Sequence, residues 1–264
     1  MARDAALTGL DTAVDGIATD AATSAELFAV VDVLDGQPRL RRSLSDPSAT
    51  DESRAGLAKR LFGGKVSEAA VAVLGAVVQK PWGSGSDLVG GLERQGIRLA
   101  LQQAQRDGSL ARVIQELYTV LTTVDGNPEL QGTLRNKALP VDGKQTLVSK
   151  LINGKVAPAT ETLASRAVKA RQRNFTTTVA SYLQMAADLT GEKIARVKVA
   201  RPLDDARVSR LKAALETQVG APVSLQIEVD PSVLGGMSVA IDDDVIESTV
   251  AGRLEQARRQ LINL

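Results

Sequence analysis

A long internal repeat is the feature that most restricts how this chain can fold. Residues 26–80 match residues 116–170 at a constant offset of 90 positions without a gap, and 15 of the 55 aligned residues are identical. Composition alone would give roughly 4 identities, allowing for the excess of Ala, Leu and Val. Two unrelated helical segments rich in Ala and Leu are the alternative, but the Asp-Gly-x-Pro and Gly-Lys-Val motifs also match. We therefore expect two copies of one structural unit.

Each copy carries the apolar spacing of amphipathic helices. Apolar residues recur at the i, i+3, i+4, i+7 spacing of a helix that buries one face, and they occupy matching places in the two copies: Leu27, Val30, Val31 and Leu34, then Leu117, Val120, Leu121 and Val124. The Asp-Gly pairs at 35–36 and 125–126 predict the ends of these helices, because Gly adopts the left-handed C-terminal conformation at low cost. Pro38 and Pro128 predict the first turns of the next helices. Each copy is expected to be a bundle of five or six short helices.

The last third of the chain has a different pattern. From Lys193 the hydrophobic period changes from that of a helix to the alternation of a half-buried strand. A helix is expected over 204–220, capped by Asp204 or Asp205 and closed by Gly220. We expect two further strands, a hairpin turn at Asp242-Asp243 and a final helix after it.

These patterns predict a mainly α fold class with two tandem helical-bundle domains followed by a small C-terminal α/β domain. The expected boundaries are residues 1–96 for the first bundle, 97–190 for the second and 191–264 for the α/β domain.

Composition excludes several classes of chemistry. The chain has no Cys and no His, which removes disulfides, thiol nucleophiles, Ser-His-Asp triads and nearly all zinc sites. Lys and Arg total 32 against 31 Asp and Glu, and 2% of the residues are aromatic, so neither charge nor base stacking favours nucleic acid. The longest apolar run, residues 69–78, is too short to cross a bilayer, and the charged start lacks a signal-peptide core. We expect a soluble cytoplasmic protein without cofactor or direct membrane insertion.

The Gly-Lys and Asp motifs indicate structural turns rather than phosphate or metal sites. Three Gly-Lys pairs, at 64–65, 143–144 and 154–155, lack the upstream Gly that a P-loop requires, and each Gly lies where a helix is expected to end. Three consecutive aspartates at 242–244 cannot converge on one cation, since neighbours in a strand point to opposite faces. Trp82, the only Trp, is expected to be a packing anchor.

Asp230, Pro231, Gly235 and Gly236 lie between two expected strands. Pro231 turns the chain, and the Gly pair can adopt positive φ or let the next strand pass close to another backbone. We expect a tight structural turn here.

This C-terminal segment resembles the delta subunit of bacterial F-type ATP synthases, a relative of the mitochondrial oligomycin-sensitivity-conferring protein. The resemblance rests on residues 229–236, then Val239, Ile241, Asp243, Val245, Ile246, Val250, Gly252, Arg253 and Leu254. The chain departs from the family pattern at Asp242 and Ser248, where Gly is frequent, and at Glu247, where Asp is frequent. Upstream matches extend the resemblance over about residues 97–264, and the earlier residues look like an extra helical copy of the kind found in actinobacterial relatives.

The resemblance implies a non-catalytic peripheral-stalk (stator) subunit of the proton-driven ATP synthase, attached peripherally at the cytoplasmic face of the cell membrane. Its implied partners are the N-terminal helix of an alpha subunit, bound by a helical bundle, and the C-terminal end of the b subunit, bound by the α/β domain. The second copy is expected to bind the alpha subunit and the first copy to add contact with the stalk.

In this family the partner helix lies in a groove between the first and fifth helices of a bundle. The matching positions of the second copy offer Leu101, Ala104, Leu163 and Ala167 as partner-binding residues. That these four residues are internal core remains an equal alternative. A helical adaptor unrelated to ATP synthase, and a small enzyme using carboxylates or Lys, also remain open.

Overall fold

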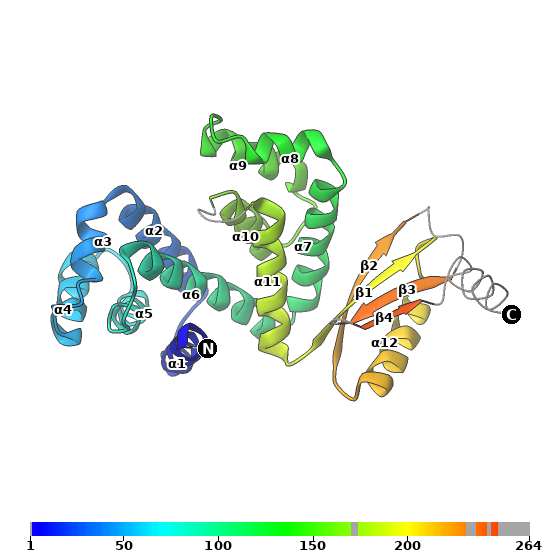
Figure 1. Cartoon of the computed structure of the whole chain (residues 1–264), viewed down its shortest axis with the longest axis horizontal. Helices are drawn as coiled ribbons and strands as arrows, with labels where there is room; N and C mark the ends of the chain where they lie inside the picture. Colours follow the sequence, from blue (N-terminus) through cyan, green and yellow to red (C-terminus); the bar gives the residue numbers. More distant parts are fainter. Residues whose placement is uncertain (1, 170–173, 231–235, 242–243, 248–264) are drawn as a thin grey trace, which may run out of the picture. The chain divides into compact units, whose positions relative to one another are not determined.

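The computed structural model describes residues 2–169, 174–230, 236–241 and 244–247 (Figure 1). Its internal contacts divide the chain into two compact units, Met1–Gly108 and Ser109–Leu264, and each unit is described by itself.

The first unit is built of helices around one apolar core. Its elements are α1 (Ala2–Asp15), α2 (Thr23–Gly36), α3 (Pro38–Leu44), α4 (Asp51–Phe62), α5 (Glu68–Val78) and α6 (Gly85–Arg106). Hydroxyls begin the last three, because Thr50, Ser67 and Ser84 each accept a hydrogen bond from the backbone N–H three residues further on. Helix α5 contributes most densely to the core, with five buried residues in three turns: Ala70, Val73, Leu74, Val77 and Val78.

The second unit begins with helices and ends in a small sheet. Its elements are α7 (Leu110–Asp125), α8 (Pro128–Arg135), α9 (Val141–Ile152), α10 (Pro158–Val168), α11 (Phe175–Thr190), β1 (Lys193–Val199), α12 (Asp205–Val219), β2 (Val223–Val229), β3 (Met237–Ile241) and β4 (Asp244–Glu247).

The two copies of the repeat have the same helices. Adding 90 to the first and last residue numbers of α4 and α5 gives those of α9 and α10. Gly64 and Gly154 end α4 and α9 and have φ values of 75° and 70°, which only Gly adopts readily. The internal duplication inferred from sequence is therefore visible in the backbone.

Helix α6 corresponds to two different helices of the repeat. Shifting α1 forward by 90 positions gives residues 92–105, shifting α11 back gives residues 85–100, and both ranges lie within α6. The expected boundary between residues 96 and 97 thus falls inside one continuous helix. The division into three domains stays a prediction, and the contacts place the boundary between units at Gly108.

The Asp-Gly pairs do not end their helices in the expected way. Gly36 still belongs to α2 and does not have a positive φ, and Gly126 has a φ of −76°. Neither Gly is therefore left-handed. The helices end instead because Pro38 and Pro128 hold the residue before each of them outside the helical region, at φ −127° and −122°. Both prolines occupy the first turn of the next helix, as expected.

The C-terminal sheet has the strand order β2-β1-β3-β4, with β1 parallel to β2 and antiparallel to β3 (Figure 1). The parallel pair requires a crossover, which α12 supplies. Asp204 caps α12 by accepting a hydrogen bond from the Arg207 backbone N–H at 2.8 Å, and Gly220 ends it with a φ of 68°. The mainly α fold class with a small C-terminal α/β part is confirmed, while the expected final helix lies outside the described residues.

Close contacts at glycines fix α6 within the first unit. A Cβ atom at Gly91 would lie 2.1 Å from the Trp82 ring, and one at Gly96 would lie 2.7 Å from the Phe28 ring. The Trp82 indole N–H also donates to the carbonyl of Val77 at 2.8 Å. Trp82 is thus a packing residue, as expected, and α6 needs Gly where these rings touch it.

Charged side chains also join α1 to α6. The Arg94 guanidinium donates two hydrogen bonds to Asp11, and the Arg98 guanidinium donates two to Asp15 at 2.5 and 2.6 Å. Gln95 adds a hydrogen bond to Asp11 at 2.7 Å. Burial would raise the pKa of Asp11, but the hydrogen bonds from Arg94 and Gln95 outweigh it and hold that pKa below its ordinary value. The hydrogen bond from Arg98 is the main cause of the lowered pKa of Asp15.

Replacing Gly91 by Ala should destabilise the first unit, because the added methyl group overlaps the Trp82 ring and overpacking costs about 1–3 kcal/mol. Gly90→Ala is the matched control, since nothing lies within 4 Å of its Cβ position and Ala in a helix is favoured over Gly by roughly 0.5–1 kcal/mol. Urea unfolding followed by Trp82 fluorescence measures both. A stability for Gly91→Ala equal to that of Gly90→Ala would refute the close contact.

Replacing Asp11 by Asn should lower the free energy of unfolding by about 1–3 kcal/mol at neutral pH, because a charged hydrogen-bonded pair is lost. The folded-state pKa of Asp11 lies below its ordinary value of 3.8, so the stabilisation by Asp11 is present above that value and is lost as the pH falls through the folded-state pKa. The variant and the parent should therefore converge in acid. Urea unfolding at a series of pH values checks this, with Glu52→Gln on the exposed face of α4 as control. A deficit that does not depend on pH would contradict the assignment.

Candidate partner-binding sites

The structure places the four predicted partner-binding residues on two helices. Leu101 and Ala104 lie on α6, and Leu163 and Ala167 lie on α10. Their relative exposures are 0%, 2%, 0% and 2% in the order given. Helix α6 belongs to the first unit and α10 to the second. That these two helices line one groove therefore remains a prediction. Side chains this deeply buried are part of the apolar core, so a partner helix would reach them only after neighbouring side chains move aside.

A carboxylate on α7 positions the start of α10. One carboxylate oxygen of Glu116 accepts a hydrogen bond from the backbone N–H of Ala157 at 2.8 Å and from the hydroxyl of Thr160 at 2.6 Å. Arg112 donates to the other oxygen at 2.7 Å. Burial would raise the pKa of Glu116, but these hydrogen bonds outweigh it and lower that pKa. The carboxylate therefore supplies the N-terminal cap that Ala157 cannot, since no side chain caps α10 at that position.

The first copy has the same carboxylate cap at the matching positions. Glu26 on α2 accepts hydrogen bonds from the backbone N–H of Ser67 at 3.1 Å and from its hydroxyl at 2.5 Å. Ser67 lies 41 residues after Glu26, as Ala157 does after Glu116. The sequence comparison contained the signal, because Glu occupies both positions of the repeat, but its role was not inferred.

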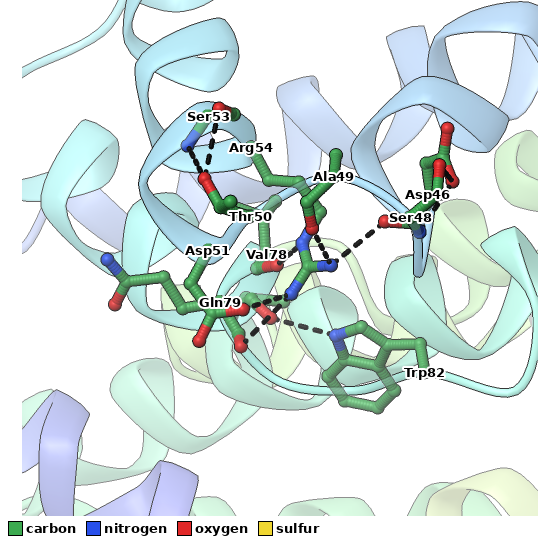
Figure 2. Close-up of polar contacts among 11 residues, drawn as sticks. Asp46, Ser48, Ala49, Thr50, Asp51, Ser53, Arg54, Val78, Gln79 and Trp82 are labelled. Carbon is green, nitrogen blue, oxygen red and sulfur yellow. Dashed lines mark hydrogen bonds and ion pairs between the residues drawn. The ribbon is translucent and has the colours of Figure 1, made fainter.

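A buried cation holds the other end of α5. Figure 2 shows the Arg54 guanidinium among backbone carbonyl groups, and its relative exposure is 6%. It donates hydrogen bonds of 2.6 to 3.3 Å to the carbonyls of Val78, Gln79, Asp46 and Ala49 and to the carboxylate of Asp51. Together with Trp82, it satisfies carbonyls at the end of α5 that the helix itself leaves unpaired.

The second copy keeps a cation at the matching position but uses it differently. Lys144 is also buried, and its ammonium group donates to the carbonyl of Leu134 at 3.1 Å. The two copies therefore share the carboxylate that begins the fifth helix but differ in the contacts of the cation.

The predicted turn after β2 is described only at its two ends. The backbone N–H of Asp230 donates to the carbonyl of Val199 at 2.9 Å, which extends the pairing of β2 with β1. Gly236 has a φ of 83° immediately before β3. Pro231 and Gly235 lie outside the described residues, as do Asp242 and Asp243, so the predicted turn stays a prediction beyond Gly236.

Two of the three Gly-Lys pairs lie at helix ends, as expected, but the third does not. Gly143 lies in the first turn of α9, because Pro140 provides the start of that helix and Gly143 comes just inside it. Within the described ranges, Asp and Glu form no group of three that could hold a metal ion. In the same part of the chain, no helix combines the length and apolarity needed to cross a bilayer.

Replacing Glu116 by Gln should destabilise the second unit by about 1–3 kcal/mol, because a charged acceptor of partly buried hydrogen bonds is lost. Since the folded-state pKa of Glu116 is lowered, this stabilisation is present above about pH 4.5 and is lost as the pH falls through the folded-state pKa. Chemical unfolding followed by circular dichroism measures the loss. The same substitution at Glu129, on the exposed first turn of α8, should change stability by less than about 0.5 kcal/mol. Equal effects at the two positions would rule out the proposed role of Glu116.

Comparison with known proteins relates the chain to one family. The family model described as ATP synthase delta (OSCP) subunit matches residues 100–261. Proteins named ATP synthase subunit delta are 37% identical in Corynebacterium urealyticum, over 96% of this chain and 93% of that protein, and 40% identical in Nocardioides sp., over 91% and 87%. The protein of that name in Cutibacterium acnes is 38% identical over 96% of both.

Among solved structures, a chain of the Toxoplasma gondii mitochondrial ATP synthase hexamer aligns with 63% of this chain at 21% identity and a TM-score of 0.33, too low to carry an argument. The family model and the relatives each cover well over half of the sequence. The chain belongs to the ATP synthase delta (OSCP) subunit family.

Proposed function

We propose that this chain is a non-catalytic peripheral-stalk (stator) subunit of the proton-driven ATP synthase, bound at the cytoplasmic face of the cell membrane through other subunits. It links the N-terminal helix of an alpha subunit on the catalytic head to the C-terminal end of the b subunit and so resists the torque of the rotor. The observation that carries this proposal is the family match over residues 100–261, which spans the second helical copy and the sheet. The adaptor unrelated to ATP synthase is not favoured by these relatives.

The proposed site for the alpha-subunit helix is a groove on the second helical copy. The proposed contact residues are Leu101 and Ala104 on α6 and Leu163 and Ala167 on α10, which a partner helix would contact with apolar residues at i, i+3, i+4 and i+7. The hydrogen bonds that Glu116 accepts from Ala157 and Thr160 support this proposal, because they fix the start of α10, the helix that carries Leu163 and Ala167.

The first copy is proposed to add contact with the stalk rather than to bind the alpha subunit. Its α5 is more apolar than α10 and is fixed at both ends, by Glu26 and by Arg54. A helix held at both termini is a stiff element, which suits a part that transmits force and does not have to adapt to an incoming helix.

Calorimetric titration with a synthetic alpha-subunit N-terminal helix tests the proposal. The titrated proteins are the full chain, fragment 1–108 and fragment 85–264, and both fragments keep the whole of α6 because cutting at residue 96 would divide it. We expect heat of binding from the full chain and from fragment 85–264, and none from fragment 1–108.

Other results would each have a definite meaning. Binding by fragment 1–108 alone would move the groove to the first copy. Absence of binding by the full chain would contradict the stator proposal. A helix of the same composition with its apolar positions scrambled is the matched control, and it should give no heat with any of the three proteins.

A further inference from the structure

Strand β2 forms one edge of the sheet and lacks the features that usually protect an edge. The strand order is β2-β1-β3-β4, so within the described residues β2 pairs with β1 alone (Figure 1). Its seven residues, Val223–Val229, pair with β1 in a continuous parallel register. Edge strands of soluble proteins are usually very short, bulged or interrupted by Pro or Lys, which prevents further pairing. None of these features occurs within Val223–Val229.

The backbone groups of β2 point alternately toward β1 and toward the free edge. The Lys193 N–H donates to the Pro222 carbonyl at 2.8 Å, and the Asp230 N–H donates to the Val199 carbonyl at 2.9 Å. In a parallel pair these two hydrogen bonds fix the alternation for the whole strand. The even-numbered residues of β2 therefore direct their N–H and C=O groups to β1, and the odd-numbered residues direct theirs to the free edge.

The free edge is covered at its start and open beyond it. The Val223 N–H donates to the carboxylate of Glu216 on α12 at 3.3 Å. The N–H and C=O groups of Leu225, Ile227 and Val229 have no hydrogen-bond partner in the part of the chain that the structure describes. Side-chain exposure rises in the same direction, from buried Val223 to Val229, which is 45% exposed. The open part of the edge is therefore a row of unpaired backbone groups, which is a template for pairing with an extended chain.

The two faces beside this edge differ in chemistry. Leu225 and Ile227 pack against the apolar cluster that includes α12. On the opposite face Glu228 lies 3.7 Å from Lys198 of β1, and a cavity of about 330 Å³ there is lined by Gln226, Glu228 and residues of α7, α11 and β1. Side chains of adjacent strands lie beside one another on the same face, and opposite charges placed in this way attract. A strand added to β2 would therefore fit best with apolar residues beside Leu225 and Ile227 and a basic residue beside Glu228, where the cavity has room for a long side chain.

We propose that the free edge of β2 is a docking site for an extended segment of a partner chain. The segment adds a strand beside Leu225, Ile227 and Val229, carries apolar residues at alternate positions and has a basic residue beside Glu228. In this mode of recognition, backbone hydrogen bonds supply affinity and alternate side chains supply specificity. The site belongs to the α/β part of the chain and does not depend on the stator function.

Amide hydrogen exchange, measured residue by residue by NMR on the full chain, tests whether the edge is free. We expect slow exchange for the even-numbered residues 224–228, which pair with β1, and fast exchange for the odd-numbered residues 225–229. Slow exchange of both sets in the monomer would show that another part of the chain covers the edge. Protection that rises with protein concentration would show that a second copy covers it. Either result would overturn the proposal.

A capped synthetic peptide with the sequence of residues 192–200 is the probe for docking. This segment contains β1, which β2 already accepts on its other side with Lys198 beside Glu228. When the peptide occupies about nine-tenths of the sites, exchange of the odd-numbered amides 225–229 should slow about tenfold. Peptides N-methylated at odd or at even positions are matched controls, because an added strand pairs through alternate residues. One of the two should protect the edge and the other should not. Equal protection by both, or none by the unmodified peptide, would overturn the proposal.

The charge of the added strand gives an independent test. The same peptide with Lys198→Glu places a carboxylate beside Glu228, so it should bind the parent chain about two- to fivefold more weakly. This difference should disappear in the Glu228→Gln chain and persist in the Glu129→Gln chain, whose substitution lies on the exposed first turn of α8. Equal binding of the two peptides to the parent would overturn the assignment of a basic residue beside Glu228.

Discussion

A partly buried carboxylate in each helical copy is the interaction on which the bundles depend. Glu26 and Glu116 each reach from the second helix of a copy to the first turn of its fifth helix and accept hydrogen bonds there. The fifth helices α5 and α10 carry much of the apolar packing, and their free N–H groups would be costly to bury without an acceptor. Each carboxylate thus connects two elements 41 residues apart in the chain, and the duplication preserved it.

Much of the fold could be predicted from sequence, because apolar periodicity and Pro positions act locally. The helices of both copies, the change to strands at Lys193 and the cap at Asp204 follow from such local rules. The continuity of α6 could not be predicted, since Gly90, Gly91 and Gly96 suggest a weak helix until the Trp82 and Phe28 rings that touch it are known. The ends of α2 and α7 lie at the predicted Asp-Gly pairs, but the predicted cause was wrong, because the constraint that Pro imposes on its predecessor acts there instead of a left-handed Gly.

The candidate sites were less predictable, because they depend on contacts between distant residues. The family resemblance pointed to Leu101, Ala104, Leu163 and Ala167, but a resemblance cannot distinguish groove contacts from ordinary core, and all four are buried. The carbonyl-binding role of Arg54 has no local sequence signature at all. Family membership supports the proposed function, and the structure adds the contacts that hold the helices of each copy together.

A stator must couple ATP hydrolysis to proton pumping, so the coupling of these two activities is the measurement that tests the proposed role. Membrane vesicles containing an ATP synthase that accepts this chain, but depleted of its own delta subunit, would be assayed for ATP hydrolysis and for ATP-driven proton pumping, before and after the purified chain is added. We expect hydrolysis to persist without the chain and pumping to appear only when the chain is restored. Pumping at full rate without the chain, or hydrolysis that requires it, would contradict the stator role.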